Sequence, residues 1–312
     1  MVRFPMIPSF STTRAEAPHT AARIERPLIH EVLFHGLGIV MIGRLLLAGN
    51  PALALVAYGV PLALYTLLIV RSCTQIHKPT GTRWQRVRLL YPFVLMNLFY
   101  QATRPAMLAL VSQTRDAWLV QSDHWLFGGD LSVLLDQHQG WIYNPLASEI
   151  FSLCYSLFFL YLTSAVLRSA RGSLDRQMAF SSGLWSVYAI GLLGYTLVPA
   201  YGPFVFFRGT YHHDIAGWFF TSLNHTIVTN GSSTFDVFPS LHVGVSLFLL
   251  LWDWRTARRW FWACLLPVVL LWASTIYLRY HYGTDLIAGA LLALGCLAIA
   301  FRNLKTYERQ PV

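Results

Sequence analysis

Two short stretches, FPSLHVG at residues 238–244 and STIYLRYHYGTD at residues 274–285, are the most informative parts of this chain. Each places a histidine, His242 or His281, at one end of a strongly apolar segment, and the second adds Asp285 four residues after His281. Ionisable groups inside a membrane are costly and therefore mark functional sites. Positions i and i+4 of a helix are neighbours, so the Asp285 carboxylate is expected to hold one imidazole nitrogen of His281 and leave the other free to attack.

The composition is that of a membrane protein. The chain has 312 residues, of which 55% are hydrophobic and 12% are charged, whereas soluble domains carry about 25% charged residues. The four cysteines form no C-x-x-C pair, which argues against a disulfide framework or a zinc site. We therefore expect an all-α, polytopic helix bundle embedded in the membrane, with no metal ion and no cofactor.

Apolar segments long enough to cross a bilayer, about 20 residues each, recur along the chain. They predict about eight transmembrane helices: residues 29–48, 52–70, 89–110, 145–167, 178–198, 238–252, 260–279 and 283–301. The predicted organisation is a cytoplasmic tail at residues 1–28, one transmembrane domain at residues 29–302 with its core at about 89–301, and a second tail at residues 303–312.

The basic residues are distributed unevenly. The net charge of +9 could indicate a nucleic-acid partner, but 18 of the 23 Lys and Arg residues fall in the tails and in alternate loops, which all lie on one side if there are eight spans. The positive-inside rule then places both termini in the cytoplasm. We expect no nucleic-acid partner, and the simple loops favour a bacterial inner membrane.

The opposite side of the membrane receives the residues that carry chemistry. Two longer loops, near residues 111–144 and 199–237, fall on this non-cytoplasmic side together with Arg104, His242 and His281. Three separate motifs therefore converge on one membrane face. The sequence predicts a site near the outer interface, open to lipid headgroups and to water.

This set of residues suits chemistry at phosphorus. A histidine nucleophile needs a carboxylate partner, here Asp285 for His281, and a general acid for the leaving oxygen, here His242. Donors must also surround the phosphoryl oxygens. Arg104 can supply positive charge, and Ser240 marks a helix N-terminus, where free N–H groups favour an anion.

With these residues the chain resembles the type 2 phosphatidic acid phosphatase superfamily over roughly residues 90–295. The family's three blocks are a lysine, six intervening residues and arginine-proline; proline-serine-glycine-histidine; and serine-arginine, five residues, histidine, three residues, aspartate. The chain shows the same spacing: Asn97 to Arg104-Pro105, Pro239-Ser240-Leu241-His242, and Ser274-Thr275 to His281 and Asp285. PSLH, SDHWLFGGDLSVLLDQHQGWIYNP and VPAYGP further resemble the inositolphosphotransferase (aureobasidin-resistance) branch.

The resemblance implies a metal-independent reaction through a phosphohistidine. His281 would be the nucleophile, Asp285 its partner and His242 the general acid, while Arg104 and Ser240 would help to bind phosphate. Asn97 and Thr275 stand where the family has a lysine and an arginine, so two cationic ligands are missing. Arg208 or Arg279 could compensate, and Arg279, four residues after Thr275, could share a helix face with it.

The resemblance thus predicts an integral membrane enzyme that cleaves a lipid phosphoester or diphosphate. Its substrate would be a lipid phosphate, a phospholipid or a sphingolipid. Water would take the phosphoryl group in a phosphatase, and a polar alcohol such as inositol would take it in a phosphotransferase.

Other interpretations stay open at this point. The polar residues could form the path of a transporter, although no internal repeat of the kind found in many transporters is visible. The missing lysine and arginine are compatible with an inactive scaffold. Individually, His281 and Asp285 could be a structural pair, Arg104 could simply reach the interface, and Asp123, Asp130 and Asp136 could be solvated or cap helices.

Overall fold

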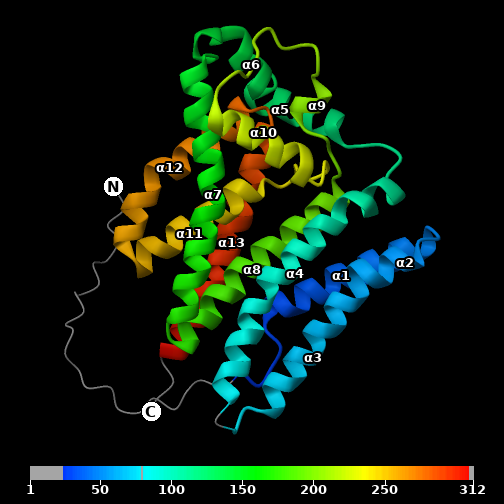
Figure 1. Cartoon of the computed structure of the whole chain (residues 1–312), viewed down its shortest axis with the longest axis vertical. Helices are drawn as coiled ribbons and strands as arrows, with labels where there is room; N and C mark the ends of the chain where they lie inside the picture. Colours follow the sequence, from blue (N-terminus) through cyan, green and yellow to red (C-terminus); the bar gives the residue numbers. More distant parts are fainter. Residues whose placement is uncertain (1–23, 79, 309–312) are drawn as a thin grey trace.

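The computed structural model describes residues 24–78 and 80–308, and the regular secondary structure of these residues is all helical, as the sequence predicts. Most of the predicted N-terminal tail and the last four residues of the C-terminal tail lie outside the described residues. The N-terminal helices are α1 (Ile29–Leu47), α2 (Pro51–Leu53), a π-helical segment (Ala54–Gly59) and α3 (Val60–Thr74). Helices α2 to α3 run on without a break and form a hairpin with α1 (Figure 1).

The remaining helices alternate between long and short ones. The long ones are α4 (Gly81–Leu110), α7 (Pro145–Arg171), α8 (Leu174–Leu197), α11 (Leu241–Thr256), α12 (Arg258–Tyr277) and α13 (Gly283–Glu308). The short ones are α5 (Asp116–Phe127), α6 (Leu131–His138), a 3-10 turn (Gly140–Ile142), α9 (Pro203–Phe206) and α10 (Phe219–Gly231).

Within the residues that the structure describes, five helices are long and apolar enough to cross a membrane: Ile29–Leu47, Pro51–Thr74, Pro145–Arg171, Arg258–Tyr277 and Gly283–Leu304. Each coincides with a predicted span. The other three predicted spans, near 89–110, 178–198 and 238–252, are also helical, as parts of α4, α8 and α11. The chain is therefore a multi-pass membrane protein.

Helix α8 lies at the centre of the bundle and packs against α1, α4, α11 and α13. Most of its residues are buried, including the three serines Ser181, Ser182 and Ser186, which lower its hydropathy. A helix that is surrounded by protein does not need an apolar surface toward lipid, and small residues allow neighbouring backbones to approach closely. This explains why α8 differs in composition from the outer helices.

Glycine sets the crossing of α11 and α13. A Cβ added at Gly289 of α13 would lie 2.3 Å from the carbonyl oxygen of Ser240 and 3.2 Å from the amide nitrogen of Gly244. The two backbones therefore touch directly where α11 begins. His242 lies between Ser240 and Gly244, the two residues that Gly289 contacts, so the crossing determines how close His242 comes to the loop before α13.

The short helices gather at one end of the molecule, at the top of Figure 1. The two loops that the sequence predicts on one side meet here: the Arg115 amide donates to the Pro199 carbonyl (2.7 Å), and the His212 amide donates to Asp136 (2.7 Å). We call residues 111–144 and 199–237 the outer cap. At the opposite end, Arg86 donates to the carbonyls of Ala170 and Gly172, which brings two of the predicted basic loops together.

Candidate active site

A histidine pair lies where α11 and α13 begin. The Nδ1 atom of His242 is 3.3 Å from Nε2 of His281, and Nδ1 of His281 is 3.4 Å from Oδ2 of Asp285. His281 and Asp285 are both buried. The structure thus joins the three residues in one line, carboxylate to imidazole to imidazole. With Asp285 accepting the Nδ1–H of His281, the lone pair of Nε2 faces His242, and this arrangement suits a nucleophile next to an acid.

The loop before α13 fixes the position of His281. Helix α12 ends at Tyr277, and the amides of Tyr280 and His281 both donate to the carbonyl of Thr275, at 2.9 and 3.2 Å. The amide of Tyr282 donates to Oδ2 of Asp285 at 2.8 Å, so the carboxylate holds the loop backbone as well as the imidazole.

His242 is held from two directions. Ser240 caps α11 through its side chain, which accepts from the Val243 amide, and the Ser240 amide donates to the Asp285 carbonyl at 3.0 Å. The imidazole packs against Tyr155 and Phe158 of α7, with ring centroids 4.5 and 4.9 Å away. The start of α11 is therefore tied directly to the start of α13, which keeps the two histidines in register.

Two carboxylates of the outer cap hold the same loop from outside. Asp123 accepts from the Gly283 amide (2.7 Å), the Thr284 amide (2.8 Å) and the Thr284 hydroxyl (2.6 Å), and so caps the N-terminus of α13. Asp116 accepts from the Tyr282 hydroxyl at 2.8 Å. Burial, together with the Asp116 charge, raises the pKa of Tyr282, so this phenol is neutral and able to donate.

These acidic residues are more buried than the sequence indicates. Solvation was one prediction for Asp123, Asp130 and Asp136, and it is wrong because all three are buried. Capping was the other, and it is confirmed for Asp130, which caps α6, and for Asp123. Sequence alone could not show this, since Asp123 caps a helix 160 residues away.

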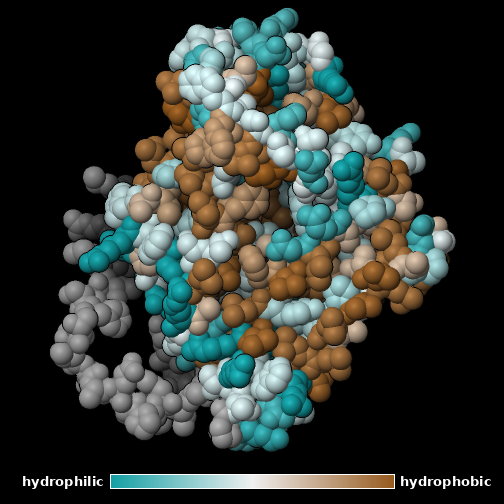
Figure 2. All heavy atoms as spheres, in the orientation of Figure 1, coloured by the Kyte–Doolittle hydropathy of each residue, from teal (hydrophilic) through white to brown (hydrophobic). Residues whose placement is uncertain are grey.

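A cavity of about 450 Å³ opens beside the histidine pair. His242 and His281 form part of its wall, and further lining residues come from helices α4, α7, α8, α9 and α10 and from the loop between α10 and α11. Exposed Phe159, Phe204 and Ile227 form part of its rim. In the space-filling view, hydrophobic residues gather around a hollow between α7 and α4, below α10 (Figure 2).

The predicted phosphate ligands are not gathered around the histidines. Asn97 lines the cavity, but its side chain is exposed and donates to the Phe93 carbonyl at 2.7 Å. Arg104 and Arg208 are exposed and lie outside the cavity lining. The Thr275 hydroxyl is buried and donates to the Trp272 carbonyl at 2.7 Å, and Ser240 serves as the cap described above. The structure thus brings together His242, His281 and Asp285, with Ser240 and Thr275 supporting their backbone.

Arg279 has a different environment from the predicted one. The sequence predicts that it shares a helix face with Thr275, and this is wrong because α12 ends at Tyr277 and Arg279 has a φ of 66°. Its guanidinium donates to Asp136 at 3.0 Å and stacks over Tyr211, 3.7 Å from the ring centroid. Arg279 is thus a buried link between the loop and the outer cap.

Most of the cavity wall could not be predicted from the sequence. Tyr100, Tyr155, Tyr195 and Asp236 all line it, although they come from three helices and a loop. The only signal was the high aromatic content of 15%. Aromatic side chains in a membrane protein are normally interpreted as packing or interfacial residues, so this signal could not identify a particular tyrosine.

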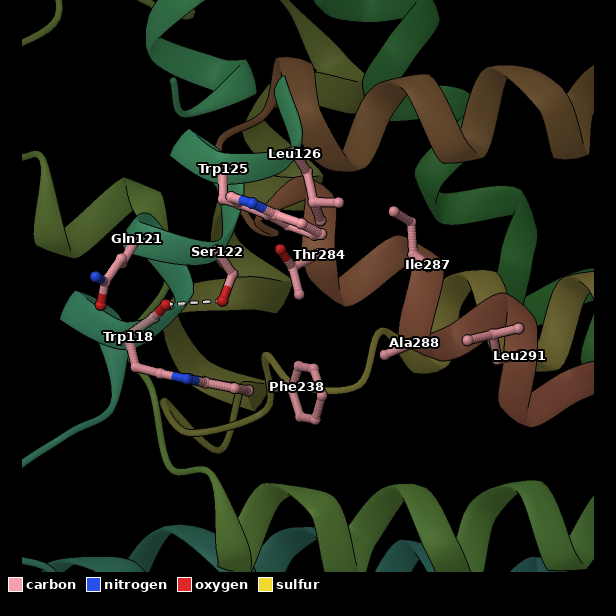
Figure 3. A pocket seen from close by; sticks show the side chains of 10 residues that line it. All are labelled: Trp118, Gln121, Ser122, Trp125, Leu126, Phe238, Thr284, Ile287, Ala288 and Leu291. Atoms are coloured by element: carbon pink, nitrogen blue, oxygen red, sulfur yellow. Dashed lines mark hydrogen bonds between the residues drawn. The ribbon is translucent and has the colours of Figure 1, made fainter. Parts of the chain in front are cut away.

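A second, more open hollow of about 520 Å³ lies outside the histidine site, between α5 and α13. Figure 3 shows Trp118, Trp125 and Leu126 of α5 facing Ile287 and Leu291 of α13 across it. Neither His242 nor His281 lines it. This groove is apolar and its lining carries no acid–base group, whereas both imidazoles line the cavity beside the histidine pair.

Comparison with known proteins identifies the family. Residues 117–299, more than half of the chain, match the family described as the PAP2 superfamily. A PA-phosphatase related-family protein of Dictyostelium discoideum is 24% identical over 218 residues, covering 59% of this chain and 39% of that protein. An inositol phosphorylceramide synthase of Candida albicans is 39% identical over 76 residues, covering 21% of this chain and 14% of that protein.

The chain therefore spans less than half the length of these two relatives. No solved structure matches it. The family match covers most of the helices that surround the histidine pair and confirms the predicted resemblance. This chain belongs to the PAP2 superfamily, with a distant partial match to inositol phosphorylceramide synthase.

Proposed function

We propose that this protein is a lipid phosphatase or phosphotransferase that works through a phosphohistidine at His281. The observation that carries the proposal is the line from Asp285 through His281 to His242 at the wall of a cavity. Buried carboxylate–histidine pairs also occur as structural links. The second imidazole and the cavity argue for chemistry, because a structural link needs neither.

The proposed reaction has two balanced steps. Nε2 of His281 attacks phosphorus and forms an N–P bond while the P–O bond to the leaving group breaks, and His242 gives the leaving oxygen its proton. Water or an alcohol then attacks phosphorus, its proton passes to His242, and the N–P bond breaks. Asp285 holds the Nδ1–H of His281 and stabilises the imidazolium.

The substrate is proposed to be a lipid because the cavity opens among helices that face the membrane. Its rim includes exposed apolar residues of α7 and α10, so a lipid can reach it sideways. We place the site near the non-cytoplasmic face of a single transmembrane domain at residues 29–302, with eight spans and both termini in the cytoplasm. A bacterial inner membrane remains the proposed location.

A phosphotransferase is the second candidate, with a polar alcohol such as inositol as acceptor. The specific observation in its favour is the 39% identity with a segment of inositol phosphorylceramide synthase. The two candidates share one intermediate and differ in the group that accepts the phosphoryl unit.

The test is to incubate purified protein with ³²P-labelled lipid phosphates and phospholipids, with and without inositol, and to quench rapidly. We expect acid-labile, alkali-stable label on the wild type and none on His281→Gln. His212→Gln is the matched control, because His212 is exposed on the outer cap away from the cavity. Free phosphate as product indicates a phosphatase, and a new labelled lipid indicates a transferase.

Two results would contradict the proposal. One is wild-type protein that carries no label and forms no product with any donor. The other is a His281→Gln variant that turns over lipid like the wild type. A scaffold predicts the first result, whereas a transporter predicts flux in liposomes that survives the loss of both His242 and His281.

A further inference from the structure

The cavity beside the histidines has an unusual charge for a site that is proposed to bind an anion. Among the described residues that line it, none is an arginine or a lysine. The ionisable groups in the lining, apart from tyrosines, are Asp236, His242 and His281. A cavity with a carboxylate and no fixed cation favours a ligand that brings positive charge.

Asp236 is built into this wall. Its Oδ1 accepts from the Ser232 hydroxyl at 2.8 Å and its Oδ2 accepts from the Tyr100 hydroxyl. The Ser232 hydroxyl also accepts from the amide of Thr234, whose φ of 67° is uncommon for a residue with a side chain. Strained backbone of this kind persists where the surroundings hold it, often at functional sites. The described residues provide no ion pair for Asp236, so its charge has only hydroxyl partners.

Aromatic rings cover the rest of the path from Asp236 to the histidines. Tyr155 packs on His242 at 4.5 Å and on Tyr280 at 5.1 Å, between ring centroids. Tyr195 and Asp236 line the same cavity. All three tyrosines line the cavity, and Phe158 packs on His242 next to them.

An aromatic enclosure with one carboxylate is the pattern that recognises organic ammonium groups. Ring faces attract cations, and cages of aromatic rings bind quaternary ammonium ligands such as choline. The walls are mostly aromatic and aliphatic and carry one carboxylate, which suits an ammonium group, and a second anionic group would be repelled by Asp236. Amide and hydroxyl side chains such as Asn97, Gln101 and Thr163 also line the cavity, so a polyol is the competing ligand that the experiment must test.

We propose that Asp236 and the surrounding tyrosines bind the positively charged ammonium headgroup of a zwitterionic lipid. The inference rests on the proposed function for the chemistry at His281, and it adds the class of headgroup that the cavity selects. A zwitterionic phosphodiester carries one negative charge at phosphorus, so it needs fewer cationic ligands than a phosphate monoester. This agrees with Asn97 and Thr275 standing where the family has cationic residues.

The decisive experiment compares two lipids that differ in one atom. Phosphatidylcholine carries a trimethylammonium group, and its 3,3-dimethylbutyl analogue has the same shape with carbon in place of nitrogen. Binding of each in mixed micelles is measured on His281→Gln protein, so the result does not depend on turnover. We expect the choline lipid to bind about tenfold or more tightly, as a desolvated cation–π site predicts. Equal binding of the two lipids would overturn the inference.

A substitution then identifies the source of the preference. Asp236→Asn should reduce the difference between the two lipids to about twofold or less, because the carboxylate charge is lost and the size is kept. Tyr100→Phe removes one hydrogen bond to Asp236 but leaves its charge, so it should keep most of the preference. If Asp236→Asn folds, shown by an unchanged thermal transition, and retains the full preference, Asp236 does not select the headgroup. The comparison of the two lipids on His281→Gln protein, in which Asp236 is intact, decides the question even if the Asp236→Asn variant does not fold.

Further measurements distinguish a lipid headgroup from a soluble amino alcohol, and the ammonium site from the proposed reaction. Micelles of phosphatidylinositol test the polyol: tighter binding than phosphatidylcholine would overturn the inference. Free choline as a competitor tests a soluble amino alcohol: displacement at concentrations comparable to the lipid would assign the site to an acceptor and overturn the lipid headgroup. If the choline lipid binds selectively but wild-type protein forms no phosphoenzyme with any donor, the proposed function fails while the ammonium site stands.

Discussion

At the scale of single residues, the two histidines have different surroundings although their nearest ring nitrogens lie only 3.3 Å apart. His281 has a carboxylate partner and His242 does not: its neighbours are the rings of Tyr155, Phe158 and His281. A carboxylate partner makes an imidazole a stronger nucleophile and stabilises the imidazolium that forms. A general acid must instead release its proton readily, and a carboxylate partner would make this release harder. The asymmetry supports the assignment of His281 as nucleophile and His242 as acid.

This assignment predicts how the loss of His242 depends on the leaving group. His242→Gln should lower kcat by about 10²–10⁴-fold for a lipid substrate, whose alkoxide needs a proton to leave. The loss should fall to about tenfold or less for a p-nitrophenyl ester, because nitrophenolate leaves without protonation. Steady-state kinetics with both substrates measures this. An equal loss with both would show that His242 positions the substrate and does not donate the proton.

Two carboxylates of the outer cap have partners that are distant in the sequence. Asp123 caps α13 across 160 positions, and Asp136 pairs with Arg279 across 143. The sequence identifies these side chains only as acids in a polar loop. Their partners depend on the approach of two loops that are distant in sequence, so no local pattern could predict them.

At the scale of helices, the site depends on the contact between α11 and α13. The backbone of Gly289 touches that of Ser240, and the Ser240 amide bonds to the carbonyl of Asp285. Any side chain at position 289 must therefore move one helix relative to the other. Because protein interiors are closely packed, such a shift cannot be absorbed locally.

Gly289→Ala should therefore lower activity by about tenfold or more and reduce thermal stability, since overpacking costs about 1–3 kcal/mol. Gly295→Ala on the same helix is the matched control, because an added Cβ there meets no atom within 4 Å. It should leave activity unchanged and alter stability by less than about 1 kcal/mol, in the stabilising direction. Activity and thermal unfolding of the two variants provide the comparison, and similar effects in both would rule out the backbone contact as the cause.

At the scale of the whole molecule, the two ends have opposite character. One end carries the outer cap and the histidine pair, and the other carries arginines that bind the carbonyls at helix ends, such as Arg86 and Arg176. Positive charge favours the cytoplasmic side. We therefore propose that the basic end faces the cytoplasm and that the end with the outer cap and the histidine pair faces the opposite side.

Cysteine labelling can test this topology. In a background without the four native cysteines, Gln137→Cys on the outer cap should react with a membrane-impermeant maleimide in intact cells. Thr82→Cys at the start of α4 should react only after lysis, because it lies at the basic end. Both residues are exposed, so accessibility within the protein is matched. Labelling in the opposite order would invert the proposed orientation.

The sequence by itself determined the helical membrane fold, the positions of the long helices and the histidine–aspartate pair. These depend on local hydrophobicity and on spacing within one turn of helix, which single segments carry. It did not determine the environment of Arg279, the buried carboxylates of the outer cap or the aromatic cavity with Asp236. Those features depend on which surfaces of distant segments meet when the helices pack. Contact, burial and pairing are each made by two segments, so neither segment's sequence alone can determine them.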